Sequence, residues 1–444
     1  MFRILFALAI AFTLTLTLPA PALAQPKTTR EEKVRNDKVK VEADGFWIYN
    51  NLPKAFEQAK KENKPIVVAL RCIPCEECVK LDDNLVDKDL TLRPLLEKFV
   101  RVRVVSTNNL DLSLFQFDYD QSFAVFLLNA DGTVYGRFGT RSHRVNWVGD
   151  VSVDGLAKAM QGALDLHAVY PKNKDVLAAK RGPKPLFPVP EKFPTLGKYA
   201  AELDYKGNVV QSCIHCHQVG DAIRDINRKK NQPLPLEVIF PYPHPKAQGL
   251  MLDPKECATV LKVEKDSPAE KSGFKPGDQI KTLAGQPLLS VADVQWVLHH
   301  TPADASSLKV EIVRNGKPGD LVFTLPKDWR QADDISWRSG AWPLRRMATG
   351  GMVLEPVDER PVGVPQTGMA LRAKHVGQFG PHAAAKNAGF LMGDIIISFD
   401  GKTDFARETD LLAYAVRTRK PGDKVAVTIV RNSKTMELTL PMQE

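Results

Sequence analysis

Six cysteines, five of them in two tight clusters, carry the most evident chemistry in this 444-residue chain. The first cluster, Cys72, Cys75 and Cys78, contains two overlapping C-x-x-C units, and the second is a C-x-x-C-H motif at residues 213–217. Thiols at this spacing can form a reversible disulfide or bind a soft metal ion. A disulfide-stapled domain would spread its cysteines along the chain, so the clustering indicates chemistry.

The second cluster, Cys213-Ile214-His215-Cys216-His217, is the attachment signature of a c-type haem. Cys213 and Cys216 would bond covalently to the haem, and His217 would be the axial ligand of its iron. The same side chains, together with His215, could instead hold zinc or form a small-loop disulfide. The motif therefore predicts a covalently bound c-type haem, and both alternatives stay open.

The first cluster follows an apolar strand, Ile66 to Leu70, that Lys64-Pro65 introduces. This arrangement, with a C-x-x-C opening a helix, resembles the thioredoxin fold. The resemblance implies that Cys75 is the nucleophile and Cys78 the resolving thiol, with Cys72 as an additional cysteine upstream. A helix N-terminus lowers a thiol pKa, whereas Glu76 and Glu77 oppose that effect, so we expect a reducing or near-neutral couple.

One position departs from the thioredoxin pattern. Family members carry a cis-proline before the strand that faces the active site, and this sequence has Phe123 there. The departure raises the alternative that Cys72, Cys75 and Cys78 bind a soft metal such as Cu(I), since three thiols suit that ion. A purely structural disulfide is the third interpretation.

The chain begins with a pattern typical of a secretory signal peptide. A short basic start, an apolar run from Ile4 to Leu18 and the small residues Ala22-Leu23-Ala24 predict cleavage after residue 24. The apolar run is too short to span a membrane, so we expect a periplasmic or otherwise extracytoplasmic protein without a transmembrane anchor. The formal net charge of +9 comes from basic residues scattered among nearly as many acidic ones, which argues against nucleic-acid binding.

Two segments of the C-terminal half repeat. Residues 267–280 are echoed by residues 383–396, and residues 309–315 are echoed by residues 425–432. The shared A-x-x-x-G-F-x-x-G-D-x-I pattern resembles the PDZ domain of bacterial envelope proteins. The resemblance implies two tandem α+β domains that bind envelope proteins or their C-terminal peptides.

Each copy contains a glycine-led apolar loop. The first is Gly249-Leu250-Met251-Leu252, and the second is Gly368-Met369-Ala370-Leu371. Backbone N–H groups of such a loop can capture a terminal carboxylate while the following strand pairs with the peptide. A silent docking module is the alternative. No serine nucleophile loop with a His and Asp framework is found, so a serine protease is not predicted.

These elements predict a multidomain chain in which an α/β thioredoxin-like domain precedes a short, mostly irregular or helical C-x-x-C-H segment and two PDZ domains. The expected divisions are a signal peptide (1–24), a flexible lead-in (25–44), the thioredoxin-like domain (45–170), a Pro-rich linker (171–194), the C-x-x-C-H segment (195–245), the first PDZ domain (246–327), a linker (328–362) and the second PDZ domain (363–444).

The combination resembles secreted bacterial multidomain thioredoxin-like/PDZ proteins, including selenoprotein relatives. This resemblance implies thiol redox chemistry in the envelope. Two functions follow: a thiol–disulfide oxidoreductase or electron-transfer protein that docks clients through PDZ domains, or a non-enzymatic PDZ scaffold with a redox-sensing or copper-binding module.

Overall fold

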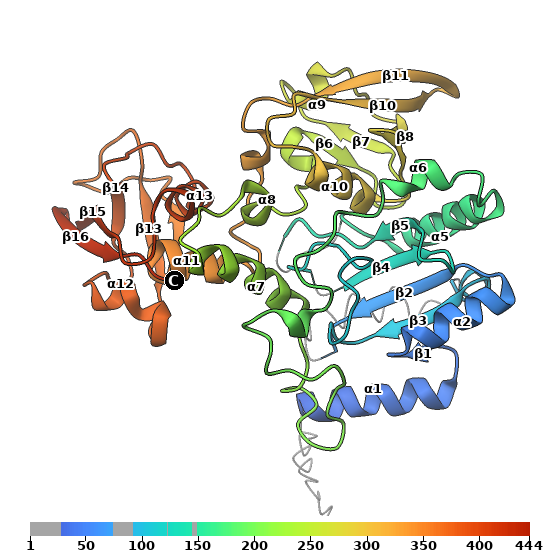
Figure 1. Ribbon diagram of the computed structural model, residues 1–444. Helices are drawn as coiled ribbons and strands as arrows, with labels where there is room; N and C mark the ends of the chain where they lie inside the picture. Colours follow the sequence, from blue (N-terminus) through green and yellow to red (C-terminus); the bar gives the residue numbers. More distant parts are fainter. Residues whose placement is uncertain (1–27, 74–91, 122, 144–148) are drawn as a thin grey trace, which may run out of the picture.

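The computed structural model describes residues 28–73, 92–121, 123–143 and 149–444, and Figure 1 shows three domains. We call them the N-terminal domain (residues 30–180), the middle domain (residues 245–332) and the C-terminal domain (residues 341–441). A connecting segment, residues 181–239, runs between them. The predicted multidomain architecture of one α/β and two α+β domains is confirmed. The predicted signal peptide lies outside the described residues.

The N-terminal domain is built on a five-stranded sheet with the order β1-β3-β2-β4-β5. β1, β3 and β2 run parallel, and β4 and β5 are antiparallel to their neighbours. Helix α5 covers one face and α2 the other, which is why β2 reads as a continuous apolar run. The elements are α1 Arg30–Asp44, β1 Ile48–Tyr49, α2 Leu52–Glu62, β2 Ile66–Arg71, α4 Arg93–Leu96, β3 Val100–Val104, β4 Phe123–Leu128, β5 Val134–Phe138, α5 Val153–Ala168 and α6 Lys174–Ala178.

The stretch predicted to be a flexible lead-in, residues 25–44, contains helix α1. Thr29 and Glu32 form a capping box at its start, and Gly45 ends it in the left-handed conformation. Val34 and Val41, seven residues apart on one face, are buried. The prediction was wrong because two buried apolar residues in a charged helix give almost no periodic signal, and tertiary contacts stabilise the helix.

The first part of the connecting segment packs on the N-terminal domain, and its end packs on the C-terminal domain. Leu112 donates a backbone hydrogen bond to Pro188, and Leu112 and Phe193 share a buried cluster with Ile214 and Val219. The segment predicted to be a Pro-rich linker therefore packs against the N-terminal domain. Its elements are η2 Pro190–Lys192, α7 Cys216–Lys229 and α8 Leu236–Ile239.

The middle domain contains a four-stranded sheet, β11-β10-β8-β9, and a separate pair of strands, β6 and β7. Helix α10 packs on a core that includes Trp296 and Trp329. The elements are η3 Pro245–Gln248, β6 Leu250–Leu252, β7 Val260–Val263, α9 Pro268–Lys271, β8 Gln279–Leu283, β9 Gln286–Pro287, α10 Val291–His300, β10 Ser307–Arg314, β11 Lys317–Thr324 and η4 Trp329–Ala332.

The C-terminal domain has one antiparallel sheet with the order β12-β13-β14-β15-β16. Helices α11 and α13 pack against each other and share its apolar core. The elements are α11 Ala341–Thr349, β12 Met352–Pro356, β13 Leu371–Val376, η5 Gly380–Ala383, α12 Ala384–Asn387, β14 Ile395–Phe399, α13 Glu408–Thr418, β15 Lys424–Arg431 and β16 Lys434–Pro441.

The two repeated motifs contact each other in the same way in both copies. In the middle domain the Arg314 guanidinium binds Asp278 at 2.6 and 2.7 Å and donates to the Gly273 carbonyl. In the C-terminal domain Arg431 makes the same contacts with Asp394 and Gly389. The Gly-Asp turn and the distant arginine therefore form one bidentate unit, which explains why they repeat together.

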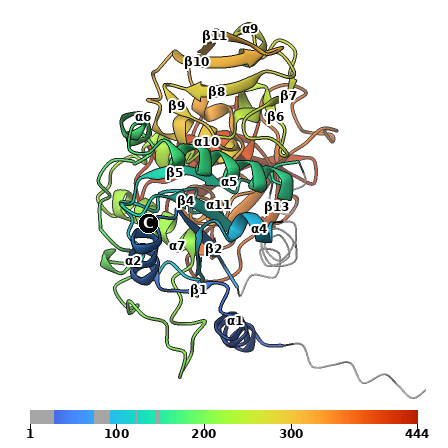
Figure 2. The same cartoon turned by 90° about the vertical axis from the view of Figure 1, so that its right-hand side faces the viewer.

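The middle domain is held on the N-terminal domain through α10, which lies against β5 (Figure 2). Lys180 and Asp293 form an ion pair at 3.0 Å, and each side chain is 1% exposed. The Arg137 guanidinium stacks over Trp296 at 3.5 Å. Gly136 allows this approach, because a Cβ there would lie 2.7 Å from Leu289. No helix among the described residues is long and apolar enough to cross a membrane.

Candidate functional site

The carboxyl ends of the parallel strands β2 and β3 form the edge at which Cys72 meets the second cysteine cluster. Leu70 pairs with Val104, so the residues that follow the strands, Cys72 and Val105, lie at one edge of the sheet. Phe123 is opposite Arg71 at the start of β4, where the missing proline was expected. In open α/β sheets this edge is where ligands and reactive groups gather.

The C-x-x-C-H segment is fixed on that edge by the chain that follows β3. The Ile214 carbonyl accepts hydrogen bonds from the Thr107 N–H at 3.0 Å and its hydroxyl at 2.9 Å. The Ile214 N–H donates to Asn108 Oδ1 at 2.7 Å, and the Ile214 side chain is fully buried. We call Thr107 and Asn108 the Ile214 clamp. It sets the position of both neighbouring cysteines.

Helix α1 supports the segment from the other side. Two oxygens of the Glu31 carboxylate accept hydrogen bonds from the N–H groups of Val209 and Val210, at 3.0 and 2.9 Å. The Arg35 guanidinium donates to the carbonyls of Tyr205 and Gly207. The helix that sequence analysis missed therefore helps to hold the second cysteine cluster against Cys72.

The clamped segment brings His215 to Cys72. The Cys72 sulfur lies 3.4 Å from His215 Nδ1. Burial, with smaller effects of His217 and Arg30, lowers the pKa of His215 to about 4, so the imidazole is neutral near pH 7. A neutral imidazole nitrogen at this distance can accept the proton of a thiol, which is how thiol nucleophiles are activated.

Cys213 and Cys216 lie beside the same cysteine. Cys213 is 6% exposed, and its sulfur lies 3.9 Å from the Val105 carbonyl oxygen. Cys216, the first residue of α7, packs against the apolar core under β2. Burial and the nearby Cys72 raise the pKa of Cys213 to about 12, and the same causes raise the pKa of Cys216. Both side chains are thus protonated thiols at neutral pH.

The predicted nucleophile and resolving thiol, Cys75 and Cys78, lie outside the described residues. The structure places only Cys72 of the first cluster. Among the described residues no group of three or more His, Cys, Asp and Glu side chains is arranged to hold a metal ion. Cu(I) binding by Cys72, Cys75 and Cys78 stays a prediction.

The C-x-x-C-H side chains, as they lie, do not fit a c-type haem. A haem bonded to Cys213 and Cys216 and ligated by His217 needs all three groups to face one flat space. Here both cysteines face the N-terminal domain, whereas the His217 side chain is 47% exposed and lies 3.5 Å from Asp221. The haem attachment predicted from the sequence would require this segment to leave its docked position.

Family models match the three domains. Residues 47–130 match a model described as thioredoxin-like, and residues 247–325 and 372–442 match the PDZ domain. The chain carries a thioredoxin-like domain followed by two PDZ domains. The N-terminal domain is the thioredoxin-like domain, and we call the middle and C-terminal domains PDZ1 and PDZ2.

Curated relatives are similar over part of the chain. A protein named "Probable periplasmic serine endoprotease DegP-like" from Pseudomonas putida (strain W619) is 37% identical over 95 residues, which is 21% of this chain and 20% of that protein. One of the same name from Pseudomonas savastanoi pv. phaseolicola is 25% identical over 203 residues, 45% of this chain and 40% of that protein. The chain thus spans about a fifth to two fifths of these relatives. Their periplasmic names fit the predicted extracytoplasmic location.

Among solved structures, the serine endoprotease from Yersinia pestis matches with 23% identity and a TM-score of 0.15, covering 19% of this chain and 28% of that chain.

In PDZ1 the predicted Gly249–Leu252 loop leads into strand β6. Gly249 has a φ of +76°, and a Cβ there would lie 2.2 Å from the Ser267 side chain, so glycine is required. Its N–H donates to the Lys246 carbonyl at 2.9 Å, and Leu250 and Leu252 belong to the core. As it lies, the loop uses the Gly249 N–H internally rather than offering it to a peptide carboxylate.

In PDZ2 the predicted loop, Gly368-Met369-Ala370-Leu371, occupies a different place. It immediately precedes β13, which is the counterpart of β7, because each is the second strand of its domain and leads to the short helix before the Gly-Asp turn. The counterpart of Gly249–Leu252 is residues 351–354, where Gly351 has a φ of +92° and β12 begins. The sequence-based position is therefore corrected.

The free edge of β12 is covered by its own domain. The Leu354 N–H donates to Glu408 Oε1 at 2.8 Å, and the Arg345 guanidinium binds the same carboxylate at 2.9 and 2.5 Å. Helix α11, which carries Arg345, packs along α13 and β12. A peptide that adds to this edge must displace these contacts.

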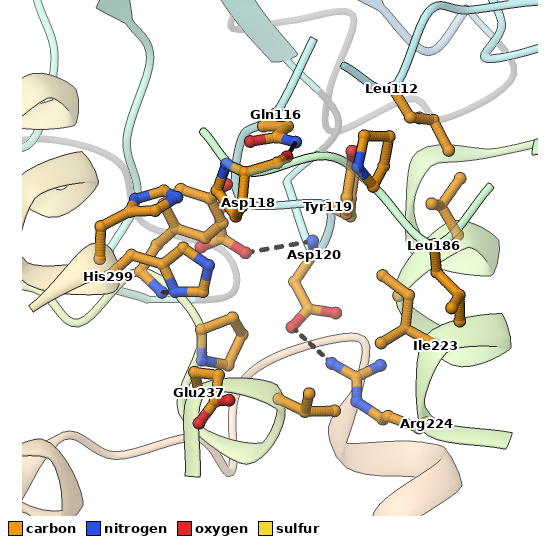
Figure 3. A pocket seen from close by; sticks show the side chains of 18 of the residues that line it. Leu112, Gln116, Asp118, Tyr119, Asp120, Leu186, Ile223, Arg224, Glu237 and His299 are labelled. Atoms are coloured by element: carbon orange, nitrogen blue, oxygen red, sulfur yellow. Dashed lines mark hydrogen bonds and ion pairs between the residues drawn. The ribbon is translucent and has the colours of Figure 1, made fainter. Parts of the chain in front are cut away.

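A cavity of about 450 Å³ lies beside α7, between the thioredoxin-like domain and PDZ1 (Figure 3). Its walls are mainly apolar, and among its charged groups Asp120 lies 3.3 Å from Arg224. Tyr119 lines it, and burial and the nearby Cys216 raise the pKa of that phenol. The labelled lining residues are Leu112, Gln116, Asp118, Tyr119, Asp120, Leu186, Ile223, Arg224, Glu237 and His299.

Sequence reasoning missed the Ile214 clamp and the role of His215 beside Cys72. The polar run Ser106-Thr107-Asn108-Asn109 directly after a buried strand was the available signal. It marks the sheet edge but does not say which distant segment docks there.

Proposed function

We propose that the protein is an extracytoplasmic thiol–disulfide oxidoreductase that docks client proteins through its PDZ domains. The contact between the Cys72 sulfur and the neutral His215 imidazole, at 3.4 Å, carries this proposal. It supplies a thiol with a proton acceptor at the sheet edge where a thioredoxin-like domain would perform such chemistry.

The reaction is a thiol–disulfide exchange. Cys72 passes its proton to His215 Nδ1, and its sulfur attacks one sulfur of a client disulfide. One S–S bond breaks and one forms, and the leaving client sulfur recovers the proton. A second thiol then releases the client with a disulfide left on the chain, and the sequence supplies Cys75 and Cys78 for that step. Two electrons and two protons pass to the client, and a dithiol donor must restore the enzyme.

The PDZ domains support the docking half of the proposal. β6 and β12 are outer strands of their sheets, and an extended client segment can pair with such an edge. The partners we propose are envelope proteins or their C-terminal peptides. A chain with these domains but without exchange activity would be the PDZ scaffold of the second interpretation.

The test is reduction of a fluorescent peptide disulfide by the full mature chain in the presence of a dithiol donor. We expect Cys72→Ser to lower the rate at least 10-fold, and Cys257→Ser, which removes a remote thiol between β6 and β7, to leave it unchanged. No turnover by the unmodified chain would overturn the proposal. A full rate in Cys72→Ser with none in Cys75→Ser would overturn the role of Cys72 and return it to the sequence-predicted pair.

A further inference from the structure

Three thiols and one imidazole from two distant segments of the sequence share one partly buried space at the ends of β2 and β3. Cys72 affects the pKa of both Cys213 and Cys216, and its sulfur touches His215, which lies between them in the sequence. The Ile214 clamp fixes the segment from within, through three hydrogen bonds to one residue. The juxtaposition is therefore built into the fold.

We propose that Cys213 and Cys216 are a second redox-active pair. The fold holds this pair beside Cys72, so that the pair and Cys72 can exchange a disulfide bond. The inference rests on the proposed function and adds an internal electron store to it. It also gives the C-x-x-C spacing a use that needs no haem.

The pair differs from Cys72 in the chemistry that its surroundings allow. Both thiols are buried enough that their pKa values lie far above neutral pH, so neither is a ready nucleophile. A disulfide carries no charge, so burial imposes no such obstacle on the oxidised pair. The attacking sulfur must come from outside the pair, and Cys72 has the imidazole that can take its proton.

The exchange balances with the dithiol donor of the proposed function as its only external reactant. When the pair is oxidised, Cys72 gives its proton to His215 and its sulfur bonds to one sulfur of the pair. The Cys213–Cys216 bond breaks, and the other sulfur leaves and recovers the proton. Two thiols of the dithiol donor then attack in turn, first on Cys72 and then on the resulting donor–Cys72 disulfide. The donor leaves as a disulfide, and its two electrons and two protons remain on Cys213 and Cys216.

The experiment traps the intermediate in the full mature chain. Cys75→Ser and Cys78→Ser leave Cys72 as the sole thiol of the first cluster, and Cys213→Ser in that background removes the internal leaving group. After incubation in a glutathione redox buffer, we expect peptide mapping without reduction to find Cys72 bonded to Cys216. The matched variant with Cys216→Ser should give Cys72 bonded to Cys213. Each cross-link should exceed any bond from Cys72 to Cys257 at least 10-fold.

The unmodified chain gives the second readout. Differential alkylation across the buffer series should show Cys213 and Cys216 converting together between dithiol and disulfide. A pair that stays reduced throughout, a pair that carries covalent haem, or variants that keep the native circular dichroism yet form neither cross-link would overturn the inference. Client reduction without a cross-link would contradict this inference but not the proposed function. Cross-linking without client turnover would contradict the proposed function but not the internal exchange.

Discussion

The Cys72 sulfur lies 3.4 Å from Nδ1 of His215, although 143 positions separate the two residues in the sequence. Cys72, from a thioredoxin-type cysteine cluster, and the C-x-x-C-H segment, which read as parts of independent centres, therefore lie in one site. His217, the expected haem ligand, is instead about half exposed and lies near Asp221. The imidazole that can act on a thiol is therefore that of His215, which precedes Cys216, and not that of His217, which follows it.

Replacing His215 tests that assignment. We expect His215→Asn to slow the reaction of Cys72 with a small disulfide at pH 7 by about 10- to 100-fold, since a positioned base contributes about that much or more. In the unmodified chain the contribution of His215 to the rate should persist down to about pH 5. The pKa of His215 is lowered to about 4, so its imidazole can still accept a proton at that pH. Stopped-flow measurement in the Cys75→Ser, Cys78→Ser background isolates Cys72.

His217→Asn is the matched control, because that side chain is half exposed and lies near Asp221. We expect its rate to stay within about twofold of the parent. Equal losses in the two variants, or no loss in His215→Asn, would show that the imidazole beside Cys72 takes no part in proton transfer.

Haem attachment and the docked segment exclude each other in this arrangement. We expect the chain, co-expressed with haem-attachment machinery and purified, to show no Soret band and no pyridine haemochrome spectrum, because Cys213 and Cys216 face the thioredoxin-like domain. The same sample should form the Cys72 cross-links. A Soret band with a haem-bearing 213–217 peptide would restore the sequence-based prediction and contradict the redox pair.

The sequence predicted the parts whose signals are local. The apolar run at 66–70 is strand β2, and Asp131-Gly132 is the turn between β4 and β5, with a Gly132 φ of +83°. The Gly-Asp turns at 277–278 and 393–394 repeat because each binds a distant arginine. Each signal lies in a few adjacent residues whose backbone or burial requirement is strong.

The parts that failed depend on contacts between distant residues. Nothing in the spacing of residues 213–217 indicates that Thr107 and Asn108 bind Ile214. In PDZ2 the glycine-led loop was misplaced because the chain between β12 and β13, residues 357–370, is longer than the chain between β6 and β7, residues 253–259. The motif placed the loop before β13, the second strand of PDZ2, instead of before β12, the first strand.

Acid should destabilise the protein through buried neutral histidines. Burial lowers the pKa of His244 to about 3, with Asp150 opposing and Lys246 and Arg338 adding to the effect. The unfolded value is near 6.5, so the folded state binds fewer protons. The stability this group contributes is complete above about pH 6.5 and is lost as the pH falls toward 3. Between pH 6.5 and 5 the loss is about 2 kcal/mol.

Urea unfolding at a series of pH values checks this. His244→Gln can still accept the Lys246 N–H but cannot titrate, so we expect its unfolding free energy to fall less between pH 6.5 and 5 than that of the parent, by about 2 kcal/mol. Parallel curves for parent and His244→Gln would contradict the buried neutral state.

The last prediction concerns peptide binding by PDZ2. The edge of β12 is covered because Arg345 holds Glu408 against the Leu354 N–H, in a pair whose side chains are at most 6% exposed. Arg345→Met frees α11 from that contact but leaves the Glu408 carboxylate buried without its partner, so the double variant with Glu408→Gln is the better probe. We expect the double variant to bind apolar C-terminal peptides about 10-fold more tightly than the parent, measured by fluorescence anisotropy on the full chain.

Arg346→Met, on the next position of α11, should bind as the parent does. An amidated peptide should lose the gain if a terminal carboxylate is captured at residues 351–354. Substituting Met369 with Leu, in the loop first predicted to bind, should leave the affinity unchanged. If instead the double variant binds no better than the parent, α11 does not restrict access to β12.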